Sequence, residues 1–567
     1  MCKDLFFLSD TKTSKISALS GGLNQQPATE SKIKREAAIA MNFIDDAPKP
    51  HFVLVPFMAQ GHSIPMIDMA HLLAKHGALV SFITTTANAT RIECTIDRAR
   101  EMNLPIQFVP LKLESTAVGL PSGCESVDKV LDKEQLKRLI DAYRMLHEPL
   151  LLCLSAQSIP PSCIISDLCQ PWTGDVAREL GIPRYIIHQG KVFENVTREN
   201  ELVVLPGFPH HIEASKAKSP GNFNFPGFEQ FGEKILEEER RADGVVTNSF
   251  YELEPLYHEA YQEKIGKKVW SLGPMFLCNT DMNAMAARGN KSSVDEKHCV
   301  RWLDSMKPGS VLYVSFGSMA RTVLSQIEEI ALGLESSKSP FLWVIKSDDK
   351  ASDIDKMMAE GFEERIRGRG FIIRGWAPQA MILSHPSVGG FMTHCGWNSI
   401  IEGISSGVPL ITWPHCAEQF LNEKLILDTL KIGVSVGVHS ITTRTMEARE
   451  VSIVKRDQIE NAVLNLMGKE IDAEERRMRA RELSQKATQA VNGGSSYKND
   501  GRSTTVKSRR PWTSSGTRDT SGAFRRTVGG RWTLTNRTHM TQPCLLQRPC
   551  EEEHQKSFPH SVQLRNQ

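Results

Sequence analysis

The sequence lacks any long apolar run and any dense cysteine framework. No stretch approaches the roughly 18 consecutive apolar residues of a membrane-spanning helix. The opening MCKDLFFLSD has an apolar run of only four residues and no small-residue cleavage pattern, so no secretory signal is expected. The 12 cysteines are scattered without a CxxC pair, which argues against a structural zinc site and fits a reducing compartment. We therefore expect a cytoplasmic protein without a membrane span.

Net charge is also nearly absent, because 68 Lys+Arg face 66 Asp+Glu. This balance gives no general attraction to nucleic acid, and we expect no nucleic-acid partner. The exception is the stretch from Asp500 to Gln567, which holds 12 Lys+Arg against 5 Asp+Glu.

Both ends of the chain lack sustained periodicity. Residues 1–48 are polar, and we interpret them as a disordered extension in which Met41 is a candidate ancestral start. Residues 498–567 are rich in Arg, Thr, Ser and Gly, and we expect a disordered basic tail of out-of-frame or intron-derived sequence. A nucleic-acid-binding tail is the functional alternative.

What the chain does contain is strand–helix–strand order in two halves. A chain of 567 residues is too long for one hydrophobic core. In the first half the pattern predicts strands at 51–56, 79–84, 163–166 and 185–187 and helices at 64–76 and 172–180. The stretches GVVTNSFYELEP (244–255) and VWSLGP (269–274) complete this half. In the second it predicts strands at 311–318, within 341–346, 370–376, 388–394 and 409–414, and helices at 325–336 and 474–491.

This order indicates parallel sheets, hence an α/β fold. The predicted domains are 49–278 and 294–497, joined by a polar linker at 279–293. Two parallel α/β domains suggest a ligand between them, at the carboxyl ends of strands. A nicotinamide oxidoreductase is disfavoured, because FGSMAR and VGGFMTHCGW are not a GxGxxG turn that opens a helix.

The stretch THCGWNS (393–399) follows a predicted strand and opens a predicted helix. Asn398 or Ser399 is expected to cap that helix, and Gly396 would let a ligand approach the backbone. A helix start of this kind suits a pyrophosphate, although capping without any ligand is the simpler alternative. A metal site is disfavoured because His394 and Cys395 would point to opposite faces of a strand. Cys395 is expected to pack in the interior.

The wider stretch from Trp376 to Gln419 resembles the signature box of plant secondary-product UDP-glycosyltransferases. The matching positions are Trp376-Ala377-Pro378-Gln379, His385, His394 to Ser399, Glu402, Gly407-Val408-Pro409, Trp413-Pro414 and Glu418-Gln419. The resemblance covers about residues 48–497 and includes the opening PHFVLVPFMAQGHSIPM. It implies the GT-B fold, in which two Rossmann-like parallel-sheet domains face a cleft.

The resemblance also implies a role for each matching residue in binding a UDP-sugar. Trp376 would stack on uracil while the Ala377 backbone pairs with its edge, and Gln379 and Glu402 would bind ribose. His394, Gly396, Asn398, Ser399 and Ser318 would hold the diphosphate. Trp397, Glu418 and Gln419 would face the sugar, and in this family a terminal Gln accompanies UDP-glucose more often than UDP-galactose. No metal and no further cofactor are expected.

His62, in AQGHSIP, lies after a strand and at a helix start. We expect the helix dipole to keep its imidazole neutral and available as a base, and the resemblance places the family's catalytic base here. Asp167 and Asp175 compete as the carboxylate that orients it. Asp167 is favoured, because it ends a strand at the edge where ligands gather.

These assignments predict an inverting O-glycosyltransferase, a monomer that transfers a sugar to a small lipophilic flavonoid, terpenoid or phenolic. About twenty residues that the family carries after Gly190 are missing, and His415 and Cys416 replace commonly apolar residues. The alternative is therefore a catalytically impaired relative that binds nucleotide sugars, with a shortened acceptor region.

Overall fold

The computed structural model describes residues 49–188, 203–204, 210–214, 227–279, 281–318, 322–346, 361–439, 441, 452–492 and 494. The expectations for residues 1–48, for the segment after Gly190 and for residues 498–567 lie outside these described residues. No helix in the described ranges is long and apolar enough to cross a membrane.

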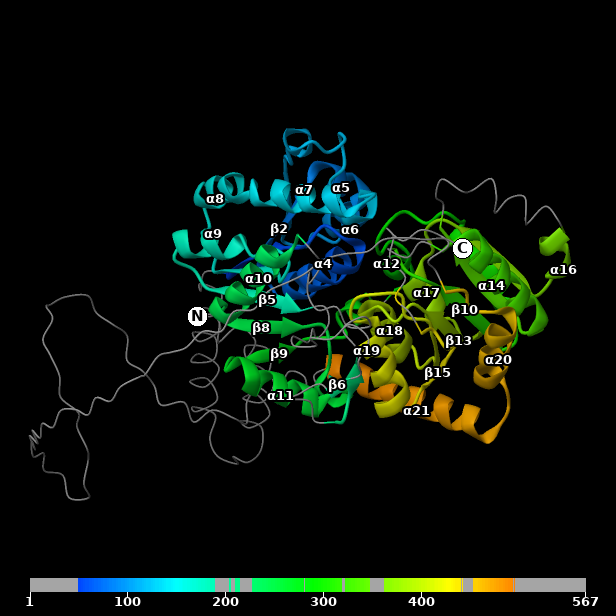
Figure 1. Ribbon diagram of the computed structural model, residues 1–567. Helices are drawn as coiled ribbons and strands as arrows, with labels where there is room; N and C mark the ends of the chain where they lie inside the picture. Colours follow the sequence, from blue (N-terminus) through cyan, green and yellow to red (C-terminus); the bar gives the residue numbers. More distant parts are fainter. Residues whose placement is uncertain are drawn as a thin grey trace, which may run out of the picture. The chain divides into compact units, whose positions relative to one another are not determined.

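The first lobe is built on a seven-stranded parallel sheet (Figure 1). Its strand order is β3-β2-β1-β4-β5-β8-β9. The strands are β1 His51–Val55, β2 Leu79–Thr85, β3 Ile106–Leu111, β4 Cys163–Asp167, β5 Arg184–His188, β8 Gly244–Thr247 and β9 Val269–Ser271. A separate antiparallel pair joins β6 Val203–Val204 to β7 Glu213–Ala214.

The second lobe is built on a six-stranded parallel sheet with the order β12-β11-β10-β13-β14-β15. Its strands are β10 Val311–Ser315, β11 Phe341–Ile345, β12 Gly370–Arg374, β13 Val388–Thr393, β14 Leu410–Thr412 and β15 Gly433–Ser435. The predicted α/β fold of two Rossmann-like domains is confirmed. Strands β3 and β15 were missed, since neither follows a strong apolar pattern.

Helices connect the strands, as the right-handed crossovers of parallel sheets require. In the first lobe they are α4 Gln60–Lys75, α5 Thr86–Arg91, α6 Glu93–Glu101, α7 Lys133–Arg144, α8 His147–Ser155, α9 Thr173–Glu179, α10 Glu229–Arg241 and α11 Pro255–Ile265. Beyond it lie α12 Met282–Ala286, α13 Glu296–Asp304, α14 Leu324–Ser336, α16 Glu363–Arg365, α17 Gln379–Leu383, α18 Trp397–Ser405, α19 Gln419–Lys424, α20 Arg456–Met467 and α21 Ile471–Val491. Short 3-10 turns include η1 Ser115–Val118, η2 Val127–Lys129, η3 Tyr251–Leu253 and η4 Met275–Cys278, and a π-helical turn spans Leu425–Thr429.

The central strands are apolar runs, because helices cover both faces of a parallel sheet. Every residue of β1, β4 and β10 is buried. In each sheet the strand order changes direction between two neighbours, β1 and β4 in the first, β10 and β13 in the second. Val55 pairs with Ser166 and Ser315 with Thr393 at these positions. Ligands of such sheets bind where the order reverses, and the predicted site residues follow these strands.

The two lobes share a hydrophobic core. Phe250, Leu253 and Phe276 of the first lobe cluster with Ile400 of α18 and with the apolar face of α21. The sequence predicts this last helix as the closing element of the second lobe only. It packs on α18 but also on η3 and η4 of the first lobe.

Residues 281–293 of the predicted linker (279–293) are packed against the rest of the molecule. They contain α12, whose Ala284 and Ala286 are buried, and α12 packs against α17 of the second lobe. The polar composition suggested a loose connection. Its polar side chains instead make specific contacts, described below.

Candidate active site

His62 and Asp167 meet at the carboxyl edge of the first sheet. His62 is the third residue of α4, and Asp167 is the last residue of the neighbouring strand β4. The imidazole Nδ1 lies 2.7 Å from the Asp167 Oδ2. Asp167 is 1% exposed and also accepts a hydrogen bond from the Cys169 amide. The competing carboxylate, Asp175, lies in α9 and pairs with Arg178.

The pKa of His62 is shifted in the direction opposite to the one expected from the helix dipole. Burial alone lowers the pKa of His62, but the Asp167 carboxylate, through its charge and its hydrogen bond, and then Glu418 outweigh it and raise the pKa above its ordinary value. The dipole argument left out the two carboxylates whose charges act on the ring. With Nδ1 bonded to Asp167, Nε2 is the nitrogen left to accept a proton from another molecule.

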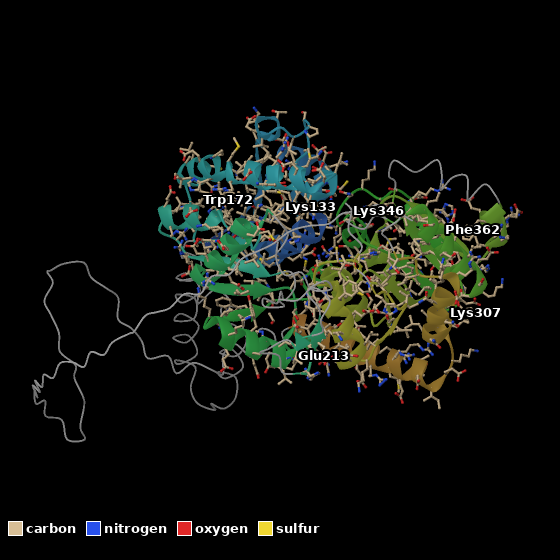
Figure 2. All side chains as sticks on the ribbon, viewed as in Figure 1. Lys133, Trp172, Glu213, Lys307, Lys346 and Phe362 are labelled. Atoms are coloured by element: carbon tan, nitrogen blue, oxygen red, sulfur yellow. The ribbon has the colours of Figure 1, made fainter. Side chains whose placement is uncertain are left out.

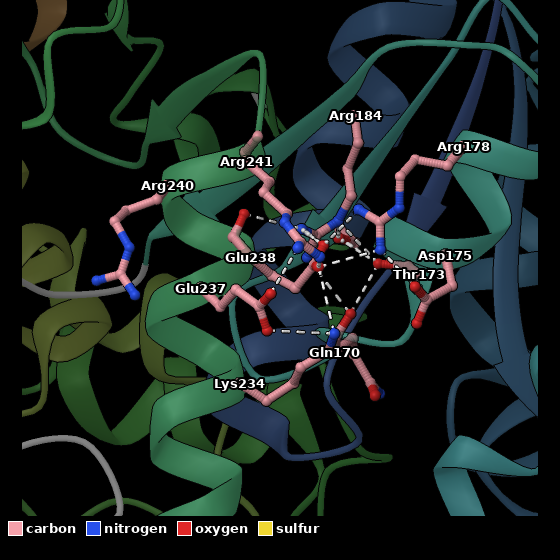
Figure 3. Close-up of polar contacts among 12 residues, drawn as sticks. Gln170, Thr173, Asp175, Arg178, Arg184, Lys234, Glu237, Glu238, Arg240 and Arg241 are labelled. Atoms are coloured by element: carbon pink, nitrogen blue, oxygen red, sulfur yellow. Dashed lines mark hydrogen bonds and ion pairs between the residues drawn. The ribbon is translucent and has the colours of Figure 1, made fainter.

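A buried ion-pair network holds the end of β4 in place behind Asp167. The Arg184 Nε donates to the Ser166 hydroxyl at 2.9 Å. Arg184 pairs with Glu238, and these side chains are 4% and 1% exposed. Figure 3 shows Arg178, Arg184 and Arg241 gathered around Glu238. Because the buried charges of Arg184 and Glu238 are paired, this network can support the strand end that carries Asp167.

Helix α18 starts two or three residues earlier than expected. Its N-cap is Gly396, without a side-chain cap, and Trp397 is its first residue. The prediction that Asn398 or Ser399 caps the helix was therefore wrong, because both lie in the first turn and their side chains bond elsewhere. Cys395 is buried in the core, so the prediction that it packs in the interior is confirmed. Its backbone φ is +63, in the left-handed region. A left-handed non-glycine residue is a strained position that is common at binding sites.

The His394 ring lies between two glycines at this helix start. A Cβ added to Gly317 would lie 2.4 Å from the His394 Cε1, and one added to Gly396 would lie 2.4 Å from its Nε2. Gly396 is thus explained by the packing of this ring. Burial, followed by the nearby His415 and Lys346, lowers the pKa of His394 to about 3. Its Nδ1 is buried without a hydrogen-bond partner.

Lys346 adds a positive charge to this edge of the second sheet. It follows β11 and is labelled in Figure 2. Its ammonium donates to the Ser318 carbonyl. His415 is 8% exposed and its Nε2 also lacks a partner. The helix start, the ammonium and the neutral imidazole donors suit an anion.

The residues expected to bind a nucleoside form a second group around α17 and α18. The Gln379 Nε2 donates to the Ser399 hydroxyl at 3.0 Å and to the Glu402 Oε2 at 2.8 Å. Ser399 and Glu402 are buried. The Trp376 backbone amide donates to the Ser293 hydroxyl, and its indole Nε1 has no partner. Ala377 follows it and is buried, with its carbonyl accepting from the Gln379 amide.

The three residues expected to face the sugar have different surroundings in the structure, as follows for Glu418, Gln419 and Trp397. Glu418 is close enough to His62 for each charge to act on the other, and burial raises the pKa of Glu418. The Gln419 Oε1 accepts from the His415 and Cys416 amides, so its oxygen braces its own loop. The Trp397 indole is in the core, where its Nε1 donates to the Asn248 carbonyl at 2.9 Å. The first lobe thus covers this side chain, and the expected contact of Trp397 with the sugar stays a prediction.

Asn398 connects the two lobes directly. Its side-chain amide donates to the carbonyl of Gly61, the residue before His62. The Asn398 oxygen accepts from the Asn248 side chain at 3.4 Å. The loop that opens α18 is thereby tied to the start of α4, so the anion-binding edge and His62 belong to one site.

Two family models match this architecture in succession. Residues 51–277 match a glycosyltransferase N-terminal domain, and residues 267–472 match the UDP-glucuronosyl and UDP-glucosyl transferases. UDP-glycosyltransferase 73C11 of Barbarea vulgaris is 44% identical over 467 residues, covering 79% of this chain and 94% of the relative. UDP-glycosyltransferase 73E1 of Stevia rebaudiana is 45% identical over 469 residues, with the same coverage. The chain belongs to the UDP-glycosyltransferase family.

Solved structures agree with this membership. Glycyrrhiza uralensis UGT73P12, complexed with glycyrrhetinic acid 3-O-monoglucuronide, is 35% identical with a TM-score of 0.70, covering 79% of this chain and 94% of that one. Arabidopsis thaliana UGT89C1, complexed with UDP-L-rhamnose, is 30% identical with a TM-score of 0.63, covering 80% and 97%. This glycosyltransferase therefore has the GT-B arrangement of two Rossmann-like domains that the resemblance implies.

The glycosyltransferase brings most of its predicted site residues to the facing edges of the two sheets. Sequence reasoning missed Arg288, Lys346 and Asn248, which join the site from a presumed linker, a strand end and a loop. Only spatial proximity reveals them, since none stands in a motif. Among the described residues, no group of three His, Cys, Asp or Glu side chains is arranged to hold a metal ion.

Proposed function

We propose that this UDP-glycosyltransferase is an inverting O-glycosyltransferase that uses UDP-glucose and a small lipophilic hydroxyl compound. The observation that carries the proposal is the 2.7 Å contact between the His62 Nδ1 and Asp167. A buried carboxylate on one ring nitrogen orients the other nitrogen as a general base. Across the lobe boundary Glu418 and the start of α18 lie close to the same imidazole.

The reaction follows from these positions. His62 Nε2 takes the proton of the acceptor hydroxyl, and the acceptor oxygen attacks the anomeric carbon of the sugar. The new C–O bond forms as the bond to the UDP oxygen breaks, and the configuration inverts. Asp167 stabilises the imidazolium that results, as a carboxylate partner does for a catalytic histidine.

The departing diphosphate needs compensation of its negative charge. The amides at the start of α18, the Ser318 loop, the His394 ring and the Lys346 ammonium supply it. Trp376, Ala377, Gln379 and Glu402 would hold the nucleoside. Because these groups can stabilise the leaving group, we propose that neither a metal ion nor another cofactor takes part.

The donor sugar and the acceptor are the finer parts of the proposal. Glu418 and the Gln419 amide nitrogen are the groups proposed to contact the sugar hydroxyls, and UDP-glucose is the donor expected from the terminal glutamine. Related structures hold quercetin, in UGT89C1, and pterostilbene, in Phytolacca americana UGT2. Apolar acceptors of this kind, each with a free hydroxyl, are therefore the first to assay.

The test measures UDP release from UDP-glucose, UDP-galactose, UDP-glucuronate and UDP-rhamnose with a panel of such acceptors. We expect acceptor-dependent release that falls on the order of 10²–10⁴-fold in His62→Ala and in Asp167→Asn. Asp175→Asn is the matched control, because Asp175 pairs with Arg178 and not with His62. Equal rates in the wild type and His62→Ala would refute His62 as the base.

The alternative is a nucleotide-sugar-binding relative without turnover, and the intact His62–Asp167 contact favours the enzyme. Tight UDP binding with no release on any acceptor would favour the alternative instead. We also propose a cytoplasmic location, in keeping with the free thiols of the nine cysteines in the described ranges. Because one chain supplies both lobes of the site, a monomer is the proposed functional unit, which light scattering can check.

A further inference from the structure

Arg288 lies between two buried carboxylates from opposite lobes. Its Nε donates to the Asp68 Oδ2 of α4 at 2.8 Å, and its Nη1 donates to the Glu402 Oε1 of α18. The side chains of Arg288, Asp68 and Glu402 are 10%, 2% and 3% exposed. A guanidinium with this fixed fork contacts two acceptors at once, which a lysine ammonium on a flexible stem does less well.

Every carboxylate oxygen of this cluster has a donor. The Asn279 Nδ2 donates to the Asp68 Oδ1 at 2.8 Å, and the Gln379 Nε2 donates to the Glu402 Oε2 at 2.8 Å. Burial acts to lower the pKa of Arg288, but Asp68 and then Glu402 raise it above its usual range. The guanidinium is therefore always charged, and it compensates the charge of Glu402 in the protein interior, where an unpaired carboxylate would be costly.

The Glu402 carboxylate can accept further hydrogen bonds from a ligand. A carboxylate has about four lone-pair positions. Arg288 occupies one on Oε1, and Gln379 occupies one on Oε2. One position on each oxygen remains, which matches the two vicinal hydroxyls of a ribose.

The same segment also contacts the proposed uracil-binding residue. Gly289 has φ +93, and a Cβ there would lie 2.4 Å from the Trp376 Cζ2. The Ser293 amide donates to the Trp376 carbonyl at 2.9 Å. Residues 288–293 therefore touch both side chains expected to hold the nucleoside.

We propose that Arg288 is a positioning residue for recognition of the donor ribose. Its contact fixes the orientation of the Glu402 carboxylate, so that both remaining lone pairs meet the 2′- and 3′-hydroxyls. The inference rests on the proposed donor site, in which Glu402 binds ribose. Recognition of the ribose would then depend on Arg288, which lies outside the signature stretch, and on its ion pair with Asp68 of α4, the helix that carries His62.

The test compares the affinities for UDP and for 2′-deoxy-UDP by isothermal titration of the full chain. A hydrogen bond to a charged group contributes about tenfold or more in affinity, so the wild type should prefer UDP by about that factor. In Arg288→Met the ratio of the affinities for UDP and 2′-deoxy-UDP should fall to about threefold or less. A merely structural role would weaken both nucleotides equally and leave their ratio unchanged.

Arg98→Met is the matched control, because Arg98 pairs with Asp281 at the start of α12 and makes no contact with Glu402. It should keep the wild-type ratio. Arg288→Lys keeps the charge and serves if the methionine variant does not fold. It loses the fork, so an intermediate ratio is expected, and a ratio equal to the wild type would overturn the inference.

Glu402→Ala distinguishes failure of the inference from failure of the donor site. A wild-type preference for UDP that is lost in Glu402→Ala and kept in Arg288→Met overturns the role of Arg288 alone. Equal wild-type affinities for UDP and 2′-deoxy-UDP overturn the ribose role of Glu402, and the role of Arg288 with it.

Discussion

His415 makes the folded protein sensitive to acid, and replacing it should relieve that sensitivity. Burial lowers the pKa of His415 from 6.5 to about 4. Below pH 6.5 the unfolded chain binds a proton at this residue that the folded chain does not, so stability is lost as the pH falls from 6.5 toward 4. Each pH unit in that window costs about 1.4 kcal/mol. Between pH 8 and pH 5 the side chain should therefore cost about 2 kcal/mol of the free energy of unfolding.

His415→Leu removes the titrating group and also the buried Nε2 that has no partner. We expect the variant to be about 1 kcal/mol more stable at pH 8, because a buried unsatisfied nitrogen is replaced by carbon. It should lose about 2 kcal/mol less than the wild type between pH 8 and pH 5.

Urea unfolding followed by tryptophan fluorescence at the two pH values measures both differences. His76→Gln is the control, because His76 is exposed at the end of α4 and should leave the acid response unchanged. An acid response of His415→Leu that parallels the wild type would refute the argument that burial keeps this imidazole neutral.

Further predictions concern the site and its support. The pKa of His62 is raised, and the residue must be deprotonated to act as a base. The pH profile of kcat/KM should therefore fall on its acid side at a pH above the pKa of an ordinary histidine. A fall that begins only below that pKa would contradict this. Gly317→Ala should weaken UDP binding about thirtyfold, because φ is +72 and the new Cβ meets the His394 ring, each worth about 1 kcal/mol; titration with UDP measures it. Trp397→Phe should lower the free energy of unfolding by about 2 kcal/mol, since the Asn248 carbonyl loses its donor and a cavity forms; urea unfolding measures it. Turnover should be unchanged after EDTA treatment, and its loss and recovery with added metal would contradict the proposed mechanism.

The sheets were predictable because their central strands are short apolar runs at a βαβ spacing. The strand at 51–56 and the helix at 474–491 appear in the structure as β1 and α21 with small shifts at their ends. Strand β3 was missed because only two of its six residues, Val109 and Leu111, are buried, so it lacks the apolar run of a central strand. The start of α4 was placed four residues late, because its first turn carries glycine and histidine and no capping side chain.

The candidate site was predictable where strand ends and motif residues coincide. The preference for Asp167 over Asp175 followed from its position at a strand end, and in the structure Asp167 contacts His62. The position of the Trp397 indole was not predictable, because it depends on Asn248, 149 residues away. The raised pKa of His62 likewise depends on Glu418 from the opposite lobe. An argument from the local sequence and the helix dipole takes account of neither Asn248 nor Glu418.

The packing of α21 on both lobes restricts how they can move. A pair of lobes joined by one connection can swivel in any direction. Here the chain crosses once through residues 281–293 and again through α21, which contacts α18 together with η3 and η4. Two connections allow fewer relative motions than one, so we expect opening for product release to be a restricted rotation of the lobes. The Asp68–Arg288–Glu402 bridge lies at the first of these connections and would limit the rotation there.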